Sequence, residues 1–159
     1  MSKSIPLTQG QFTLVDDGDY EYLNQWKWQA SKPLNSPRNY YAVRNQQGHS
    51  GQGKILMHLM LLPLSDGKQT DHIDGNSLNN CRSNLRRCTY AENQFNRHPN
   101  RNTVSGYKGV ALNKSGKKWQ VYCGGLYYGV YANKEDAALR YNCVAQLKYG
   151  QFARLNIIS

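Results

Sequence analysis

The amino-acid sequence predicts an α+β fold, because two groups of short strand candidates are each followed by a helix candidate. Between residues 5 and 62, alternating apolar and polar residues are interrupted by turn-forming Pro, Gly, Asn and Asp. Between residues 106 and 156, three short strand candidates precede one long helix candidate. We therefore expect a β-rich N-terminal region and, near the C-terminus, a small three-stranded antiparallel sheet packed on one helix.

The first strand of the N-terminal region is expected at Gln11–Val15, where apolar and polar residues alternate. Asp16–Asp19 has the composition of a turn. Within Tyr20–Ala30, Trp26 and Trp28 are two residues apart, so both indoles are predicted to lie on one face of a strand.

The rest of this region contains a further strand candidate, Asn39–Arg44, between two predicted loops, Ser31–Pro37 and Gln46–Gly53. Ile55–Leu62 is apolar and is either a strand or a short helix, since periodicity does not distinguish the two at this length. We interpret the aromatic residues of the region as core side chains rather than ligand-binding groups: Trp26, Trp28, Tyr40 and Tyr41.

The stretch from Thr70 to Asn96 contains the candidate chemistry. An aspartate and a histidine are adjacent, a turn-rich loop and a short apolar-basic segment follow, and a helix then starts. Thr89 and Glu92 have the T-x-x-E spacing of a capping box, in which each side chain satisfies a backbone donor of the first turn. Asp, His and amide side chains gathered in this way can hold one hard cation and one general base.

Positive charge is concentrated in the middle of the chain. The formal net charge is +10, yet residues 1–81 carry seven basic and seven acidic residues. Residues 82–118 carry nine basic residues against Glu92 alone. Such a block indicates a polyanionic partner, of which nucleic acid is the usual one. The alternative is a solvated basic face.

The basic block includes a polar linker and leads into the C-terminal strands. Residues 94–106 lack a sustained apolar period, and Pro99 interrupts any helix. This segment either follows a phosphate backbone or acts as a flexible tether. Strands are then expected at Gly106–Ala111, Lys118–Cys123 and Leu126–Tyr131.

The final helix is predicted from its ends. Asn133 is a suitable N-cap, Glu135 and Asp136 complement the helix dipole, and Gly150 follows the expected last residue near Tyr149. Small and apolar residues at helical spacing would let this helix sit close to the sheet: Ala137, Ala138, Tyr141, Val144 and Ala145.

The stretch at 70–96 resembles the ββα-metal finger of HNH endonucleases, particularly the phage and intron-encoded homing branch. The shared motifs are D-H-x-D-G-N at 71–76, N-L-R at 84–86 and A-E-N-Q at 91–94. The resemblance implies a nuclease region over residues 1–97, with the finger at about 68–97. It implies His72 as the general base, Asp71 and Asn93 as ligands of one magnesium or manganese ion, and Asn84 as a residue that orients the loop or His72.

The resemblance also concerns the segment upstream of the finger. Relatives often have a His followed by an Arg where this chain has His58 and Leu59. We interpret His58 as a supporting residue that packs beneath the finger, and another basic residue would have to replace the arginine. Phosphates are expected to be held by Arg82, Arg86 and Arg87, and loss of any one should lower the salt slope of DNA binding by about one unit.

Residues 106–156 resemble the DNA-binding domain of plant ethylene-response factors, the Apetala family, which also occurs fused to phage HNH nucleases. The matching motifs are Y-K-G-V at 107–110, K-W at 118–119, Y-G-V-Y at 128–131, E-D-A-A-L-R-Y-N at 135–142 and A-R-L-N at 153–156. The resemblance implies a sheet that lies in the major groove. The linker is taken as residues 98–105. DNA contacts are expected from this linker, from the residue before it and from the outward sheet face: Arg97, Arg101, Lys108, Lys114, Lys118, Gln120, Tyr122 and Tyr127.

Other features limit the cofactors and the compartment. The four cysteines, at positions 81, 88, 123 and 143, form no C-x-x-C pair, so no zinc site is expected. The N-terminus lacks a signal peptide, and no apolar run approaches the roughly 20 residues of a membrane span. We expect a reduced cytoplasmic protein, encoded by a phage and located in the host cytoplasm, that acts on double-stranded DNA without a membrane or an obligatory protein partner.

Two functional hypotheses follow. In the first, the chain is a metal-dependent, homing-type DNA endonuclease that nicks duplex DNA. In the second, it is a non-catalytic, sequence-preferring DNA-binding protein with a relic finger. Asp71, His72 and Asn93 are all present and favour the enzyme. An RNA-binding protein would fit the charge but not the two DNA-associated modules.

Overall fold

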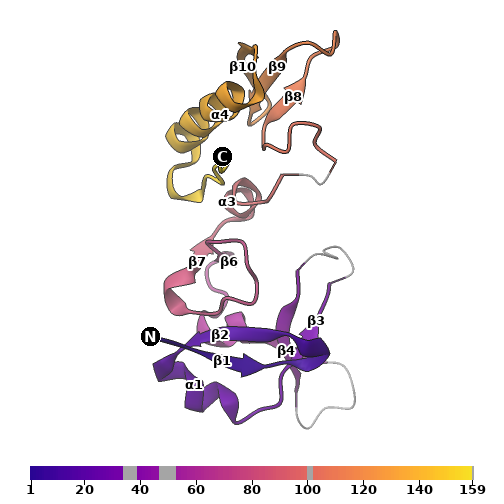
Figure 1. Cartoon of the computed structure of the whole chain (residues 1–159). Helices are drawn as coiled ribbons and strands as arrows, with labels where there is room; N and C mark the ends of the chain where they lie inside the picture. Colours follow the sequence, from indigo (N-terminus) through magenta and orange to yellow (C-terminus); the bar gives the residue numbers. More distant parts are fainter. Residues whose placement is uncertain (34–38, 47–52, 100–101, 159) are drawn as a thin grey trace. The chain divides into compact units, whose positions relative to one another are not determined.

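The computed structural model describes residues 1–33, 39–46, 53–99 and 102–158. The chain forms two compact units, Met1–Tyr90 and Ala91–Ser159, and each contains a buried apolar cluster. Small antiparallel sheets and four α-helices are found in the described ranges, so the predicted α+β class is confirmed (Figure 1). Within those ranges no helix has both the length and the apolar character needed to cross a membrane.

The first unit contains three small antiparallel sheets in its described residues, with strand orders β1-β2, β3-β4-β5 and β6-β7. Its elements in chain order are β1 (Ser2–Pro6), a 3-10 helix (Thr8–Gly10), β2 (Phe12–Asp16), α1 (Asp17–Asn24), β3 (Gln29–Ser31), β4 (Tyr41–Asn45), β5 (Lys54–Leu56), α2 (Met57–Leu61), β6 (Gln69–His72), a 3-10 helix (Arg82–Asn84) and β7 (Leu85–Cys88).

The core of the first unit is built from alternate residues of the strands and one side of each short helix. Removal of these apolar side chains from water is the main stabilising term. The buried cluster consists of Ile5, Leu7, Val15, Leu23, Trp28, Ala30, Ala42, Met57, Leu61 and Leu85.

The acidic segment after β2 is a helix, which corrects the predicted turn at Asp16–Asp19. Helix α1 begins at Asp17 and has Asp17 and Asp19 in its first turn, where the exposed backbone N–H groups favour negative charge. The prediction of a strand that contains both indoles is also wrong. Trp28 instead donates its Nε1–H to the Leu23 carbonyl at 2.8 Å, so the chain folds back around the end of α1 before β3.

The ambiguous apolar run at 55–62 divides between both structures, because β5 ends at Leu56 and α2 begins at Met57. The strand predicted at Asn39–Arg44 is confirmed as β4. Among the aromatic residues, Trp28 is in the core, and Trp26 and Tyr40 pack against it. Parts of both predicted loops, 34–38 and 47–52, lie outside the described residues.

The second unit begins at Ala91, the second residue of α3 (Tyr90–Phe95). Its further elements are β8 (Val110–Leu112), β9 (Trp119–Cys123), β10 (Leu126–Tyr131), α4 (Lys134–Tyr149) and a 3-10 helix (Gly150–Phe152). The three strands form an antiparallel sheet in the order β10-β9-β8, and α4 packs on one face of it (Figure 1). This is the predicted three-stranded sheet with one helix.

Both ends of α4 are as predicted. The Asn133 side chain accepts a hydrogen bond from the Asp136 N–H at 2.8 Å, and Gly150 follows with a positive φ of 52°. The first strand is shorter than predicted, since β8 begins only at Val110. Gly109 has a φ of 72°, and a Cβ at this position would lie 2.1 Å from the Tyr141 ring, so the chain bends where the helix approaches.

Candidate active site

The adjacent Asp71 and His72 end strand β6, and the antiparallel register sets them opposite Arg86 and Leu85 of β7. Both side chains are buried, with 7 % and 6 % of their residue surfaces exposed. The Asp71 carboxylate accepts two hydrogen bonds at its Oδ2 atom from Arg86, from Nε at 2.9 Å and from Nη2 at 2.8 Å. The guanidinium therefore compensates a carboxylate that would be unfavourable to bury alone.

His72 is held by a buried amide and two rings. Its Nε2 atom is 3.1 Å from Asn80 Oδ1. The ring centroid is 5.1 Å from that of His58 and 6.3 Å from that of Tyr41. These contacts come from β4, α2 and the loop after β6, so three separate elements fix one imidazole.

Burial keeps both histidines of this cluster neutral near pH 7. It lowers the pKa of His72, against the opposing effects of the Asn80 hydrogen bond and the Asp74 and Asp71 charges. Burial and the nearby His72 lower the pKa of His58 to about 4. A neutral imidazole is the form that accepts a proton from water.

Asn84 organises the loop between β6 and the 3-10 helix. Its Oδ1 accepts from the Asp74 N–H at 3.0 Å, and its Nδ2 donates to Asp74 Oδ1 at 2.9 Å and to the Asn79 carbonyl at 2.8 Å. Asp74 also accepts from the Asn76 N–H and from Asn79 Nδ2, each at 2.8 Å. Of the two roles left open for Asn84, these contacts correspond to orientation of the loop.

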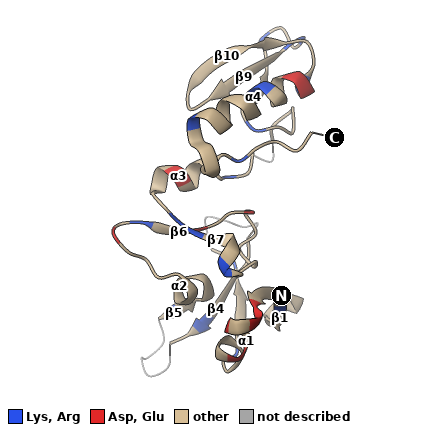
Figure 2. Ribbon diagram, turned by 90° about the vertical axis from the view of Figure 1, so that its left-hand side faces the viewer, with Lys and Arg blue, Asp and Glu red and all other residues tan. Residues whose placement is uncertain are grey.

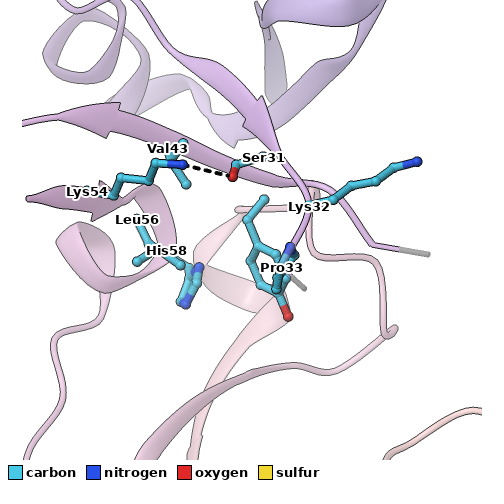
Figure 3. Close-up of a pocket in the computed structure, with 8 residues that line it drawn as sticks. Ser31, Lys32, Pro33, Val43, Lys54, Leu56 and His58 are labelled. Carbon is cyan, nitrogen blue, oxygen red and sulfur yellow. Dashed lines mark hydrogen bonds between the residues drawn. The ribbon is translucent and has the colours of Figure 1, made fainter. Parts of the chain in front are cut away.

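A cavity of about 450 Å³ lies beside this cluster (Figure 3). It is lined by Ser31, Lys32, Pro33, Tyr41, Val43, Lys54, Leu56 and His58. Lys54 Nζ donates to Ser31 Oγ at 3.4 Å, the bond dashed in Figure 3, whereas Lys32 Nζ lies 4.4 Å from the centroid of the Tyr40 ring. The lining therefore combines apolar walls with His58 and the lysine side chains of Lys32 and Lys54.

Asn93, the other predicted metal ligand, is carried by α3, and the second unit holds the end of that helix. The Phe95 ring stacks on Tyr149 with centroids 3.8 Å apart and planes inclined by 16°. The Phe95 carbonyl accepts from Lys108 Nζ at 2.6 Å and from the Arg154 N–H at 3.3 Å. The end of α3 is thus packed against other elements of the second unit.

A comparison with known proteins identifies two viral relatives. The chain is 32% identical over 159 aligned residues to an uncharacterized HNH endonuclease, L560, of Acanthamoeba polyphaga mimivirus, and the match covers 92% of this chain and 81% of the relative. The chain belongs to the HNH endonuclease family. Protein 3.8 of Escherichia phage T7 is 38% identical over 58 residues, which cover 36% of this chain and 48% of the phage protein. No family model and no solved structure matches.

The donor chemistry of this HNH-family site suits a hard cation. In the described ranges, no three His, Cys, Asp or Glu side chains form a group that could hold a metal ion. The predicted set instead has one carboxylate, Asp71, and one amide, Asn93. Oxygen donors of this kind fit magnesium or manganese, which retain water molecules in their remaining positions, and do not fit the sulfur and nitrogen preference of structural zinc.

The basic residues predicted to hold phosphates differ in their surroundings. Arg82 forms a two-point ion pair with Asp19 of α1, at 2.7 and 2.8 Å, and α1 is one of the acidic segments in Figure 2. Arg86 is paired with Asp71, as described above. Arg87 is exposed on β7. Two of these three arginines therefore form ion pairs with carboxylates of the first unit.

The basic residues predicted to contact DNA in and near the linker also differ in their surroundings. Arg97 is exposed and bonds Gln94 Oε1 at 2.8 Å. Lys108 is half-buried and donates to the carbonyls of Phe95 and Arg97 at 2.6 and 2.7 Å. Burial, together with the charges of Arg154 and Arg97, lowers the pKa of Lys108 to about 8. Arg101 lies outside the described residues.

The remaining predicted contacts gather on the second unit's sheet. Tyr122 of β9 pairs with Tyr127 of β10, their ring centroids are 5.6 Å apart, and both are exposed. Half-buried Gln120 lies two residues before Tyr122 on the same strand. Lys114 and Lys118 are exposed at the turn between β8 and β9. The outward face is consequently aromatic beside the β9–β10 turn and basic at the β8–β9 turn.

Sequence reasoning missed three residues of the site. Thr13 and Asn80 are fully buried behind His72, and Lys54 lines the cavity. Asn80 is adjacent to Asn79 in a turn-rich loop, where an asparagine is an ordinary residue and indicates no contact with His72. Thr13 gave no signal, because its relation to His72 depends on a contact between β2 and a loop 65 residues later.

Proposed function

We propose that this chain is a metal-dependent HNH endonuclease that hydrolyses phosphodiester bonds in duplex DNA and, as in homing-type relatives, nicks one strand. The observation that carries the proposal is the buried Asp71–His72 pair at the end of β6, where His72 is neutral and fixed by Asn80. The relative named as an HNH endonuclease, which covers most of the chain, supports the same reaction.

His72 accepts a proton from a water molecule as the water oxygen attacks phosphorus. The bond to the 3′-oxygen breaks, and that oxygen leaves and takes a proton from solvent. A divalent cation bound by Asp71 and Asn93 would supply the positive charge that stabilises the phosphate oxygens and the leaving oxygen. Arg86 forms an ion pair with the Asp71 carboxylate and orients it.

DNA binding is assigned to the exposed basic and aromatic residues. Phosphates are contacted by four exposed side chains: Arg87, Arg97, Lys114 and Lys118. Relatives often have an arginine where this chain has Leu59, and Lys54, which lines the same cavity as His58, supplies the corresponding positive charge. The sheet of the second unit would dock in the major groove, as its resemblance to the Apetala family implies, through the paired Tyr122 and Tyr127.

The alternative is a DNA-binding protein with a relic finger, and one observation favours it. Arg86 already places a cation on Asp71 at 2.8 Å, so an active protein must bind its metal ion beside this guanidinium. Cation-dependent cleavage distinguishes the two functions.

The test uses supercoiled plasmids that carry random-sequence inserts, incubated with the protein in magnesium, manganese or EDTA. We expect nicked circles only with a cation, loss of cleavage in His72→Ala, and retained cleavage in Ser83→Ala, an exposed position in the same finger. His72→Ala should bind DNA in EDTA as the parent does. Absence of cleavage by the parent, together with salt-sensitive DNA binding, would refute the enzyme and support the alternative.

A further inference from the structure

We propose that Thr13 and Asn80 are positioning residues that fix the tautomer of His72, with the hydrogen on Nε2 and the lone pair on Nδ1. This inference rests on the proposed function of His72 as the general base. It assigns the accepting nitrogen and gives a role to two residues that contact neither metal nor DNA in the proposed mechanism.

The direction of each hydrogen bond follows from a backbone carbonyl. The Leu78 carbonyl oxygen can only accept, so the Thr13 hydroxyl, 2.8 Å away, must donate its single hydrogen to it. Thr13 Oγ1 then has only acceptor capacity for its other close neighbour, the Asn80 side chain at 2.8 Å. The Asn80 atom that faces Thr13 is therefore the Nδ2 amide.

The orientation of the Asn80 amide determines which ring nitrogen of His72 carries the hydrogen. Asn80 Oδ1 faces His72 Nε2 at 3.1 Å, and an amide oxygen can only accept. His72 Nε2 must carry the hydrogen, so Nδ1 carries the lone pair of the neutral ring. If the Asn80 amide were reversed, its Oδ1 would face Thr13 Oγ1 and would need the Thr13 hydrogen. Thr13 Oγ1 and the Leu78 carbonyl oxygen would then lie 2.8 Å apart without a hydrogen between them.

The carbonyl that sets this direction is itself fixed. Strand β2 and the loop after β6 form a short parallel bridge, in which the Leu14 N–H donates to the Leu78 carbonyl at 2.9 Å and the Asn80 N–H donates to the Leu14 carbonyl at 2.8 Å. The first strand pair of the unit thus orients the catalytic loop, although β2 contributes no group to the proposed chemistry.

Burial makes the arrangement selective. Thr13 and Asn80 have no exposed surface and His72 has 6 %, so water cannot readily replace a missing partner. The sulfur of Met57, 3.9 Å from Thr13 Oγ1, is a poor substitute for a carbonyl acceptor. An unpaired polar group at this depth is unfavourable, and the network is stable only in the stated direction.

The first experiment reads the tautomer directly in the full chain, without metal or DNA. Long-range ¹H–¹⁵N correlation of ring-labelled protein distinguishes the two tautomers of a neutral imidazole. The sequence contains four histidines, and the His72→Ala spectrum identifies the His72 signals by their disappearance. We expect the parent protein to show His72 with hydrogen on Nε2 alone. A parent spectrum with hydrogen on Nδ1 overturns the proposal whatever the variants do.

The matched variants are Thr13→Val, which keeps the shape and removes the hydroxyl, and Thr13→Ser, which keeps the hydroxyl. In Thr13→Val the Asn80 amide loses its fixed direction, so we expect both His72 tautomers in the spectrum. In Thr13→Ser we expect the single parent tautomer. A single unchanged tautomer in folded Thr13→Val would refute the role of Thr13.

The second readout is single-turnover cleavage. General base catalysis contributes on the order of 10² to 10⁴ in rate, so partial misdirection of the base should slow Thr13→Val about tenfold. DNA affinity in EDTA should not change, and Thr13→Ser should recover most of the rate. A parent protein that cuts no DNA would refute the proposed function, while the tautomer measurement would still decide the hydrogen-bond direction.

Discussion

Replacement of His58 by Gln should flatten the acid dependence of stability of the first unit. In the folded protein, burial and His72 lower the pKa of His58 to about 4, whereas an unfolded histidine has a pKa near 6.5. Between these values the unfolded state binds more protons than the folded state. Stability contributed by neutral His58 is therefore present above pH 6.5 and is lost as the pH falls toward 4.

The magnitude follows from the difference of about 2.5 pKa units, which corresponds to about 3.4 kcal/mol when fully developed below pH 4. At pH 4.5 the loss is about 2.5 kcal/mol, and at pH 7 it is below about 0.3 kcal/mol. Among the groups that face His58, Tyr41 has a pKa that burial raises above its ordinary value of 10, and His72, whose pKa burial lowers, is present in both proteins. The difference between parent and variant thus isolates His58.

Urea unfolding at pH 7 and pH 4.5 measures the effect. Both proteins should carry Trp119→Phe, so that fluorescence reports only Trp26 and Trp28 of the first unit. The parent should lose about 2 kcal/mol more than His58→Gln between the two pH values. The absolute stabilities will differ through packing, so the comparison is between the pH-dependent losses. Equal losses in the two proteins would refute the assignment of His58 as a buried neutral group.

Two further predictions concern the second unit. Phe95→Ala and Tyr149→Ala should each speed hydrogen exchange of residues 90–97, and the double variant should show a coupling free energy of about 1 kcal/mol between the two rings. Tyr149→Phe, which keeps the ring, should retain the protection of the parent. Additive effects of the two alanine substitutions would show that the stacked pair does not hold α3. Gly109→Ala should destabilise the unit by at least about 2 kcal/mol more than Gly116→Ala in thermal unfolding. Both glycines have φ near +70°, but only at Gly109 does a Cβ meet the Tyr141 ring, and equal effects would contradict this clash.

Elements with strong local signals could be predicted from the sequence. Helix α4 has its N-cap, its dipole-matching acids and its terminal glycine within the segment itself. The acidic segment at Asp16–Asp19 was assigned incorrectly, because the same residues are typical of turns and of helix starts. The position of α1 depends on Trp28, which bonds the Leu23 carbonyl at its end, and that tertiary contact has no local signature.

The candidate site shows the same division. The motif carries Asp71 and His72 on one strand and Asn84 at the end of the following 3-10 helix, so their proximity could be predicted from local sequence. The ion pairs of Arg82 and Arg86 could not, because charge alone does not tell a phosphate-binding arginine from one that pairs with Asp19 or Asp71. Composition predicts a basic surface, and only the folded structure shows which cations are available to a ligand.

The burial of polar groups behind His72 links the N-terminal sheet to the candidate active site. A solvent-exposed histidine could exchange tautomers through water. His72 is 6 % exposed and contacts a fully buried amide, so its orientation depends on the strand that fixes that amide. Strand β2 therefore constrains the site as firmly as the motif residues do. Substitutions that loosen the β1–β2 pair should reduce the rate of cleavage before they reduce DNA affinity, because the exposed basic residues of the second unit are independent of this network.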